Sequence, residues 1–464
     1  MSTKDKDLKR REFLGTVSAA AMAGALAASR QLMAAGGASA DGPAAGQTGR
    51  GYATWPFAVA PIPLVRIGFV GVGLQGTSHV ENLVQIPGCR VTAICDVDKA
   101  RIAIASKVIT DAGQPAPRVY DRGPRDFERL CETEDLDLVY TATPWEWHVP
   151  VMLAAMTSGK HAVTEVPAAM SVEDCWAIVN AAEKYQKHCL LMENCNYDRP
   201  EMMVYNMVRQ GILGEVIHAE GAYLHDLRAI KFEDRSEGLW RRAWATKLNG
   251  NLYPTHGLGP IANCLDNNRG DRFDYMVSMS GPSRGLQDWR KEHVPADSLK
   301  QRERYVCGDV NLSLIKMQSG KTIVVQHSTN LPRPYSRINL VQGTKGLFMG
   351  YPNRVYIEGR SAKNDTFEDM SVWMKDYEHP LWKEISQKAA GAGHGGMDFI
   401  EDWRLIKCLN EGTPTDFNVY DAAAISAVVG LSVQSVARQG QPVSFPDFTR
   451  GKWKTSAPWE IVHA

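Results

Sequence analysis

The order of apolar and polar segments from Leu64 to Asp96 predicts a strand, a glycine turn, a helix and a second strand. Val65, Ile67, Phe69 and Val70 form a short apolar run, which is consistent with a strand buried in a parallel sheet. A helix is predicted to begin at 77, and a second apolar strand over 91–95 ends immediately before Asp96. This succession is the first unit of a Rossmann sheet.

The same rhythm of strands and helices continues to residue 187. Strands are predicted over 137–141 and 161–164, with an amphipathic helix over 149–158 between them. Ser171 is placed to cap a further helix that runs to about Lys187. Loops that follow such parallel strands are where ligands bind in open α/β sheets.

From residue 188 the pattern changes to strands of a different kind. They are predicted at Met192, 216–224, 275–280, 310–317, 321–326 and 338–342, with helices at 200–210, 399–410 and 422–438. Gln318-Ser319-Gly320 is typical of a hairpin turn, and the glycine-rich segment 389–396 of a loop whose His394 either reaches the site or ends a turn. The predicted fold class is α/β. An N-terminal Rossmann doubly wound parallel sheet (64–187) precedes a C-terminal α+β domain (188–464) with an open, mostly antiparallel sheet, whose last helices pack back on the first domain.

The N-terminal segment has the order of an export signal. Lys9, Arg10 and Arg11 precede a weakly apolar Ala/Gly-rich run and a small-residue cleavage pattern at 38–40. The paired arginines are typical of the twin-arginine route, so residues 1–40 are predicted to direct export to the periplasm and 41–63 to form a linker. The apolar run is too short for a transmembrane helix, and no stable membrane anchor is expected.

Composition limits the partners of the protein. Lys+Arg and Asp+Glu both number 52, and this neutral balance gives no electrostatic reason to bind nucleic acid. The nine cysteines are scattered and odd in number, and no compact ligand spacing indicates a metal site, so none is expected. The pattern fits a protein that folds in the reducing cytosol before export.

Gly71, Gly73 and Gly76 give the G-x-G-x-x-G spacing of a dinucleotide site. Asp96 follows the last glycine by about 20 residues, where a carboxylate accepts hydrogen bonds from ribose hydroxyls and repels a 2′-phosphate. The sequence therefore predicts NAD rather than NADP. An exported enzyme has no pool with which to exchange spent cofactor, so a reaction with no net redox change is favoured.

At this point the chain resembles the glucose–fructose oxidoreductase/inositol dehydrogenase superfamily and, within it, glycoside hydrolase family 109. The segments that carry the resemblance are GVGLQG (71–76), TPWEWH (143–148), EVPAA (165–169), MENCNY (192–197), AYLHDLR (222–228), WRR (240–242) and NLYPTHGLGP (251–260). The resemblance implies hydrolysis of a terminal, α-linked N-acetylgalactosamine by a cycle of oxidation, elimination, addition and reduction, which is an exception to the two-carboxylate scheme.

The resemblance also implies the site residues. For NAD they are Gly71, Gly73, Leu74, Gln75, Gly76, Asp96, Trp145, Glu146, Trp147, His148, Glu165, Val166 and Asn194. For the sugar they are Tyr223, Arg241, Tyr253, Pro254, Thr255, His256 and Tyr335. The candidate acid–base residues among them are His256, Tyr253 and His148.

Two departures from the superfamily pattern bear on this interpretation. Val166 stands where ordinary dehydrogenases have lysine, which argues against simple alcohol oxidation. Leu252 stands where many of them have an aspartate, which leaves the role of His256 open. The alternatives are an exported sugar oxidoreductase with tightly bound NAD(P) and a non-enzymatic binding protein. A homo-oligomer is expected because broad sheet faces of this kind commonly pair subunits.

Overall fold

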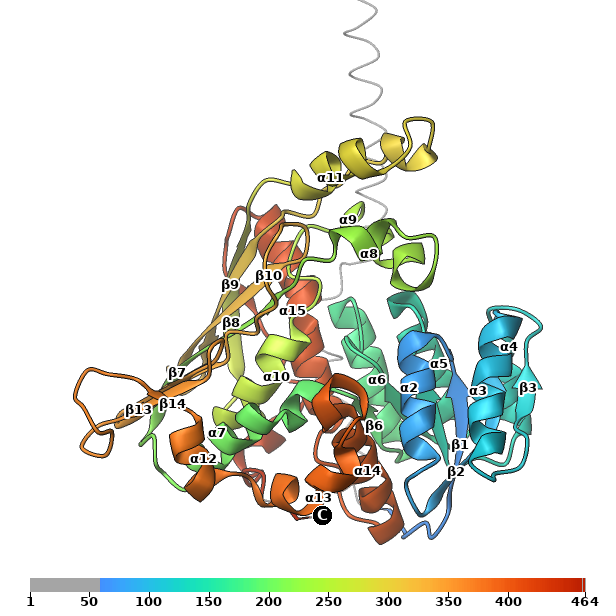
Figure 1. Ribbon diagram of the computed structural model, residues 1–464, viewed down its shortest axis with the longest axis horizontal. Coiled ribbons are helices and arrows are strands. Elements are labelled where there is room, and N and C mark those ends of the chain that lie inside the picture. Colours follow the sequence, from blue (N-terminus) through green and yellow to red (C-terminus); the bar gives the residue numbers. More distant parts are fainter. Residues whose placement is uncertain (1–58, 461, 464) are drawn as a thin grey trace, which may run out of the picture. The chain divides into compact units, whose positions relative to one another are not determined.

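The computed structural model describes residues 59–460, 462 and 463. The predicted export signal and most of the predicted linker lie outside these residues. Gly51–Ala464 forms one compact unit, in which two sheets are joined by helices (Figure 1).

The first sheet is fully parallel, with the strand order β3-β2-β1-β4-β5-β6. Its strands are β1 (Val65–Val70), β2 (Cys89–Cys95), β3 (Arg118–Tyr120), β4 (Leu138–Thr141), β5 (His161–Thr164) and β6 (Cys189–Leu191). Its helices are α2 (Leu74–Leu83), α3 (Lys99–Asp111), α4 (Asp126–Thr133), α5 (Trp145–Thr157) and α6 (Val172–Tyr185). The predicted Rossmann domain is confirmed, and Ser171 caps α6 by accepting from the Asp174 N–H at 3.0 Å.

Two predictions in this region are wrong in detail. The strand expected at Met192 in the second sheet is instead β6, which pairs with β5 in the parallel sheet, so a boundary at 187 divides that sheet one strand early. The segment Trp145–His148 is not a loop but the first turn of α5, with Pro144 as its N-cap. A proline at position 150 lies inside this helix and does not end it.

The second sheet is mixed and mostly antiparallel, in the order β14-β13-β12-β11-β7-β10-β9-β8-β15, with one parallel pair between β7 and β10. Its strands are β7 (Val216–Leu224), β8 (Phe273–Ser280), β9 (Asn311–Met317), β10 (Thr322–Ser328), β11 (Leu340–Gly343), β12 (Gly346–Met349), β13 (Arg354–Ile357), β14 (Glu368–Asp369) and β15 (Val443–Ser444). The predicted hairpin between β9 and β10 is present, and Gly320 adopts the positive φ of 98° that its turn requires.

The other helices connect the strands or cover the sheets. They are α7 (Arg199–Arg209), α8 (Arg228–Phe232), α9 (Arg241–Ala245), α10 (Thr255–Cys264), α11 (Gly285–His293), α12 (Ser371–Tyr377), α13 (Pro380–Ala389), α14 (Met397–Glu411) and α15 (Val419–Ala437). Short 3-10 turns are η1 (Asn194–Tyr197), η2 (Ser236–Leu239), η3 (Leu299–Arg302), η4 (Gly393–Gly396) and η5 (Lys452–Lys454). The segment 389–396 is thus the end of α13 followed by η4.

The late helices pack against the parallel-sheet region. Helix α14 contacts α2, and α15 lies between α6 and β8, so it joins the two sheets (Figure 1). Asn418 and Asp421 form a capping box at the start of α15. This helix is long and apolar enough to span a membrane, but 78% of the stretch is buried inside the protein, as expected for a core helix.

Candidate active site

The glycine turn after β1 has the geometry that a bound pyrophosphate needs. Gly71 has a φ of 85°, and a Cβ at Gly76 would lie 2.0 Å from the Gly71 carbonyl oxygen, so neither position tolerates a side chain. A Cβ at Gly73 would meet nothing within 4 Å, which leaves the N-terminus of α2 open. The first N–H groups of α2 are therefore accessible to an anionic group.

Asp96 connects this turn to the end of β2. Its Oδ2 accepts from the Val72 N–H at 2.8 Å, and its Oδ1 accepts from the Asp98 N–H at 2.8 Å. Each carboxylate oxygen retains a second lone pair with which to accept from a ribose hydroxyl. Leu74 is 62% exposed at the first position of α2, an apolar surface on which a cofactor can pack.

The two tryptophans in the first turn of α5 pack against different parts of the protein. Trp145 is buried and stacks on Tyr253 with ring centroids 5.8 Å apart. Trp147 instead contacts Phe127 of α4 edge-on at 6.0 Å, which ties it to the core of the first domain, and Glu146 is exposed. Of these residues, Trp145 is the one that the structure brings to the predicted sugar-binding residues.

His148 is unsuited to the acid–base role that the resemblance implied. It is fully buried, with Nδ1 at 2.8 Å from the Pro167 carbonyl oxygen and Nε2 at 2.9 Å from that of Thr143. Burial lowers its pKa, although the two carbonyls oppose this. Because both ring nitrogens are occupied by backbone groups, His148 fixes the loops after β4 and β5 and has no nitrogen with which to take a substrate proton.

Glu165, which follows β5, is held by a buried histidine that the sequence did not reveal as a site residue. His79 of α2 lies with Nε2 at 2.8 Å from Glu165 Oε1 and Nδ1 at 2.8 Å from Asp402 Oδ2 of α14. Burial alone would lower the pKa of His79, but the two carboxylates raise it well above the ordinary value, so it is an imidazolium. Glu165 Oε2 accepts from the Val166 N–H at 3.0 Å, and both carboxylate oxygens are thus engaged within the protein.

The structure supplies a carboxylate partner for His256 from a distant part of the chain. Glu193, just before η1, is fully buried, and its Oε1 lies 2.7 Å from His256 Nδ1. His256 is 14% exposed in its side chain, which leaves Nε2 as the nitrogen that can face a ligand. His256 therefore has a carboxylate partner although Leu252 stands where many dehydrogenases have an aspartate, because Glu193 orients the histidine instead.

Close packing of α10 on β7 sets the place of His256. A Cβ on Gly257 would lie 2.2 Å from the Ala222 nitrogen, so the helix can approach the strand only because this position is glycine. The approach puts the His256 ring 5.5 Å from the Tyr223 ring. Helix α10 begins at Thr255 with Pro254 as its N-cap, and Thr255 is fully buried.

The predicted sugar residues form one aromatic wall with a cation in it. The rings of Tyr223 and Tyr253 are 4.5 Å apart, and Tyr335 contacts Tyr223 at 6.1 Å. The Arg241 guanidinium lies 4.9 Å from the Tyr253 ring centroid. Burial raises the pKa of Tyr253 well above its ordinary value, although Arg241 opposes this, so its hydroxyl is a hydrogen-bond donor rather than a base.

A second histidine–carboxylate pair comes from the segment after α13. His394 Nδ1 lies 2.7 Å from Asp398 Oδ2, and Asp398 also accepts from Asn194 Nδ2 at 2.7 Å and from Gln75 Nε2 at 3.2 Å. The hydrogen bond to Asp398 raises the pKa of His394, whose side chain is 54% exposed. His394, left open by the sequence, is thus tied to two predicted cofactor residues, Gln75 and Asn194.

The described residues contain one group with metal-ligand chemistry, made of Glu193, Cys195 and His256, whose ligand atoms all lie within 4.8 Å of one another. Burial raises the pKa of the Cys195 thiol well above its ordinary value, so the thiol stays protonated. Protonated sulfur is a poor metal ligand. The group is better described as the His256–Glu193 pair with a neighbouring thiol.

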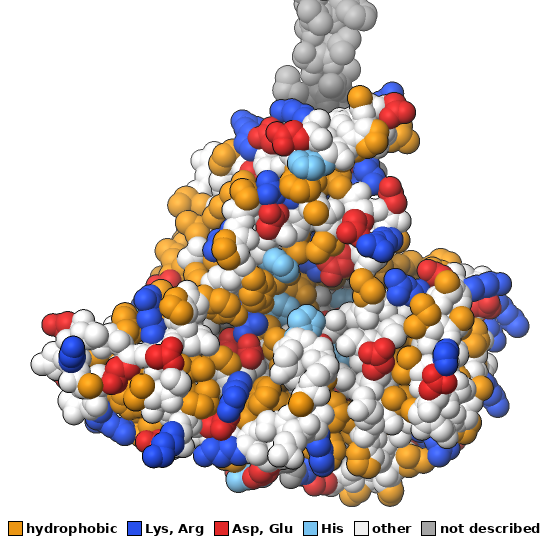
Figure 2. Space-filling model, in the orientation of Figure 1, with side chains coloured by type: hydrophobic (Ala, Val, Ile, Leu, Met, Phe, Trp, Pro, Cys, Tyr) orange, Lys and Arg blue, Asp and Glu red, His pale blue; other side chains and the backbone are white. Residues whose placement is uncertain are grey.

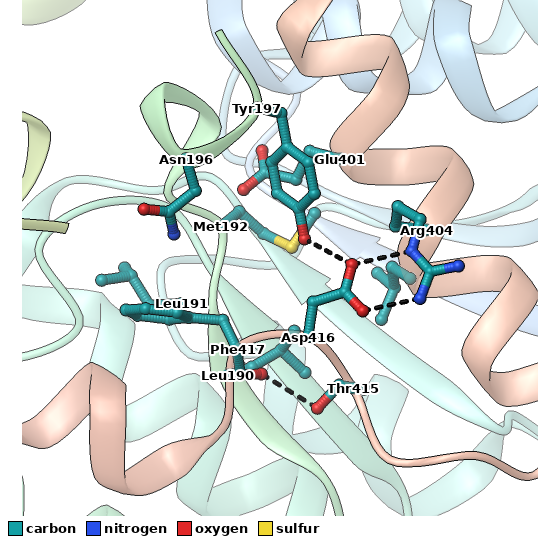
Figure 3. Close-up of a pocket in the computed structure, with 11 residues that line it drawn as sticks. Leu190, Leu191, Met192, Asn196, Tyr197, Glu401, Arg404, Thr415, Asp416 and Phe417 are labelled. Atoms are coloured by element: carbon teal, nitrogen blue, oxygen red, sulfur yellow. Dashed lines mark hydrogen bonds and ion pairs between the residues drawn. The ribbon is translucent and has the colours of Figure 1, made fainter. Parts of the chain in front are cut away.

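A small internal cavity at the end of β6 contains none of the predicted site residues (Figure 3). Its polar lining includes Asn196, Glu401 and the ion pair between Arg404 and Asp416. Burial raises the pKa of Glu401 well above its ordinary value, so this carboxyl group is neutral. At about 10 Å³ the cavity has room for about one water molecule, which is too little for a sugar.

On the face shown in Figure 2, histidine side chains gather in a hollow. The ring contacts join Tyr223, His225, Tyr253, His256 and Tyr335 into one cluster, and none of the three histidines His225, His256 and His394 is fully buried. The predicted sugar residues and the His256–Glu193 pair therefore lie where α10 packs on β7 and η1. The His394–Asp398 pair is joined to η1 through Asn194.

This fold and this glycine turn define an NAD-binding oxidoreductase scaffold, in which Tyr223, Tyr253 and Tyr335 form an aromatic cluster. A family model described as "Oxidoreductase family, NAD-binding Rossmann fold" matches residues 65–193, and one described as "Glycosyl hydrolase 109, C-terminal domain" matches residues 197–455. The chain belongs to glycosyl hydrolase family 109, and its cofactor is NAD.

Curated relatives match this chain over nearly its full length. The chain is 46% identical over 464 residues to a glycosyl hydrolase family 109 protein of Shewanella baltica (strain OS155 / ATCC BAA-1091), covering 99% of this chain and 100% of the relative. It is 47% identical over 464 residues to one of Shewanella sp. (strain MR-4), with the same coverage of both chains, 99% and 100%.

Among solved structures, levoglucosan dehydrogenase in complex with NADH and L-sorbose shares the fold with a TM-score of 0.63 and 20% identity, over 83% of this chain and 100% of that one. The scyllo-inositol dehydrogenase of Lactobacillus casei, with NAD(H) and scyllo-inositol, gives a TM-score of 0.58 and 15% identity, over 82% of this chain and 99% of that one.

Proposed function

We propose that this protein hydrolyses the glycosidic bond of a terminal, α-linked N-acetylgalactosamine with no net change in the oxidation state of its NAD. The observation that carries the proposal is the presence of two histidine–carboxylate pairs. His256–Glu193 lies beside the predicted sugar residues, and His394–Asp398 contacts the predicted cofactor residues Gln75 and Asn194. Oxidation of an alcohol releases one proton and needs one base. An elimination that breaks a C–O bond also needs an acid for the leaving oxygen, and so two titratable groups.

When bound, NAD supplies a reversible hydride acceptor that makes the neighbouring C–H bond of the sugar acidic. His256 Nε2 is placed to take the proton from that carbon, because Glu193 holds its other nitrogen and stabilises the charge it gains. Tyr253 and Arg241 are placed to bind sugar hydroxyl oxygens. His394, whose pKa is raised by Asp398, is suited to give a proton to the leaving oxygen.

Val166 supports this reading over simple alcohol oxidation. In place of a lysine ammonium, the loop after β5 has an apolar side chain, and the preceding residue, Glu165, is held by the buried His79, which also contacts Asp402. The chain thus has no lysine at the position that serves ordinary dehydrogenases of the superfamily, whereas it has an additional acid–base pair.

The test is incubation of the purified protein with para-nitrophenyl N-acetyl-α-galactosaminide, without added NAD, in deuterated water. We expect release of nitrophenol, no net change in absorbance of NADH, and deuterium at C2 of the released sugar. A product without C2 deuterium would reject elimination. Reduction of the bound NAD to NADH, up to one per chain, without release of nitrophenol would support the alternative function, an exported sugar oxidoreductase.

We further propose that the protein is exported already folded by the twin-arginine route. The support is the Lys9–Arg11 segment ahead of a weakly apolar run, together with nine cysteines that are all buried and free. Fractionation of the producing cells tests this. Wild type is expected in the periplasm, whereas a variant with Arg10→Lys and Arg11→Lys is expected in the cytoplasm; an unchanged distribution would reject the route.

We propose a homo-oligomer that pairs through the outer face of the second sheet. Cross-strand neighbours on this face include Met279 opposite Leu312 and Val277 opposite Leu314, and three of these four side chains are exposed. Light scattering after size exclusion is expected to show an oligomer that Leu314→Lys weakens, whereas Leu299→Lys, at another exposed leucine, leaves it intact. A monomer in the wild type would reject the proposal.

A further inference from the structure

Lys231 of α8 is a buried lysine without a carboxylate partner. Its side chain is part of a residue only 4% exposed, and its Nζ donates to Asn330 Oδ1 at 2.6 Å, to Thr329 Oγ1 at 2.7 Å and weakly to the Thr329 carbonyl at 3.4 Å. Among the residues that the structure describes, no carboxylate oxygen lies within 4.0 Å of it. A buried ammonium surrounded by neutral oxygens alone is costly, because its charge is not compensated.

A cavity of about 10 Å³ lies next to Lys231, with room for about one water molecule or one small ion. Its lining residues are Trp145, Lys231, Arg241, Ala245, Leu252, Cys307, His327 and Thr329. The lining contains two cations and no carboxylate. The cavity is thus distinct in charge from the cavity of Figure 3, whose lining includes Glu401 and Asp416.

Two buried polar groups at this place lack partners. His327 is 3% exposed and Asn330 is fully buried, and neither His327 Nδ1 nor Asn330 Nδ2 has a hydrogen-bond partner within the described part of the chain. His327 lines the cavity itself. An unpaired buried donor costs free energy unless a further group accepts from it, and an acceptor in the cavity would serve His327.

Lys231 has no carboxylate in contact with its ammonium group. Arg241 is paired with Glu237, whose Oε2 lies 2.8 Å from Arg241 Nε. Lys231 has no such pair, although the carboxylates of Glu237 and Asp309 act on it from beyond ion-pair distance and oppose the lowering of its pKa by burial. A water molecule accepts hydrogen bonds but brings no charge, whereas a monovalent anion does both.

We propose that this cavity binds a small monovalent anion, of which chloride is the natural representative, between Lys231, Arg241 and His327. The anion gives Lys231 a contact partner of opposite charge, which the protein itself does not supply, next to the wall that holds Arg241 at the predicted sugar site. Burial among the protein groups alone lowers the pKa of Lys231 to about 7, and an adjacent anion raises it again, which keeps the lysine charged near neutral pH. This inference does not depend on the proposed glycosidase activity.

The direct test is diffraction from crystals of the full protein grown or soaked in sodium bromide. We expect an anomalous peak inside the cavity, at hydrogen-bond distance from Lys231 Nζ. No anomalous peak there at saturating bromide would overturn the proposal, and a water molecule at that place would be the simpler occupant.

The test in solution compares melting temperature in sodium chloride and in sodium gluconate at equal ionic strength. Binding to the folded state raises stability as ln(1 + [Cl⁻]/Kd), so we expect a saturable rise in chloride that is absent in gluconate. His327→Leu and Lys231→Met are expected to lose this rise. Lys316→Met, at a lysine of β9 outside the cavity, is the matched control and keeps it.

If Lys231→Met does not fold, His327→Leu and the bromide crystal still decide the question. Equal melting temperatures in the two salts, or a chloride effect that His327→Leu leaves unchanged, would overturn the proposal.

Discussion

Substitution of Glu193 by glutamine tests whether this residue activates His256. The carboxylate is fully buried, and its Oε1 lies 2.7 Å from His256 Nδ1 and accepts the Cys195 N–H at 3.2 Å. Glutamine keeps the size of the side chain and one oxygen acceptor, but removes the negative charge. The variant therefore leaves the histidine in place and withdraws the charge that stabilises its protonated form.

The expected loss follows from the nature of this hydrogen bond. A hydrogen bond to a charged group contributes about 1.5–3 kcal/mol. Because each 1.36 kcal/mol is a factor of ten in rate, kcat is expected to fall about 10- to 150-fold. KM is expected to change little, since Glu193 has no exposed surface with which to contact substrate.

The assay measures kcat and KM with the nitrophenyl substrate, together with NAD bound per chain and the unfolding midpoint. Glu193→Asp, which restores the charge on a shorter side chain, is expected to recover part of kcat. Glu132→Gln, at an exposed glutamate of α4, is the matched control. A kcat within threefold of wild type, with NAD fully bound, would refute the role of Glu193, and so would a change confined to KM.

Three further predictions concern the cofactor, the buried network and the second histidine. Asp96→Ala is expected to reduce NAD per purified chain, and unchanged occupancy would show that Asp96 serves only the backbone of its own loops. His79→Leu leaves two buried carboxylates without their cation and is expected to cost about 3–5 kcal/mol in urea unfolding, against little for the exposed His293→Leu. The pKa of His79 in the folded state is raised above 6.5, so its contribution to stability is complete below pH 6.5 and is lost as pH rises through the folded pKa. A difference in the free energy of unfolding between wild type and His79→Leu that widens at alkaline pH would contradict this. His394→Ala is expected to slow cleavage of a sugar leaving group by about 10²–10⁴ and of nitrophenol much less, and equal losses would reject its role as the acid.

Much of the fold follows from the sequence because its strands differ so clearly in pattern. The strands β1 and β4 are mostly apolar and almost wholly buried, whereas β9 mostly alternates between buried and exposed residues. The strands from β12 to β15 are four residues or fewer, so no periodicity distinguishes them from turns. Strand β6 was placed in the wrong sheet because three apolar residues do not specify a partner, which depends on the register with β5.

The candidate site could be predicted only where a local motif carries it. The glycine turn, Asp96 and the Tyr253–His256 segment can each be recognised from a few neighbouring residues. The partner of His256 does not, because Glu193 lies 63 residues earlier and meets it only through the packing of α10 on β7. The network of His79 with Asp402 spans 323 residues, and no local spacing reveals it.

The short turn η1 links the two histidine–carboxylate pairs to the cofactor domain. Glu193 holds His256, and the next residue, Asn194, donates to Asp398, which holds His394. Both residues directly follow β6, the last strand of the parallel sheet. The two histidines come from α10 and η4, far apart in sequence, yet their orientation depends on adjacent residues of one turn. The positions of the proposed base and the proposed acid are therefore set from the same edge of the sheet that binds NAD, which is what the proposed reaction needs, because its hydride and proton transfers occur on neighbouring carbons.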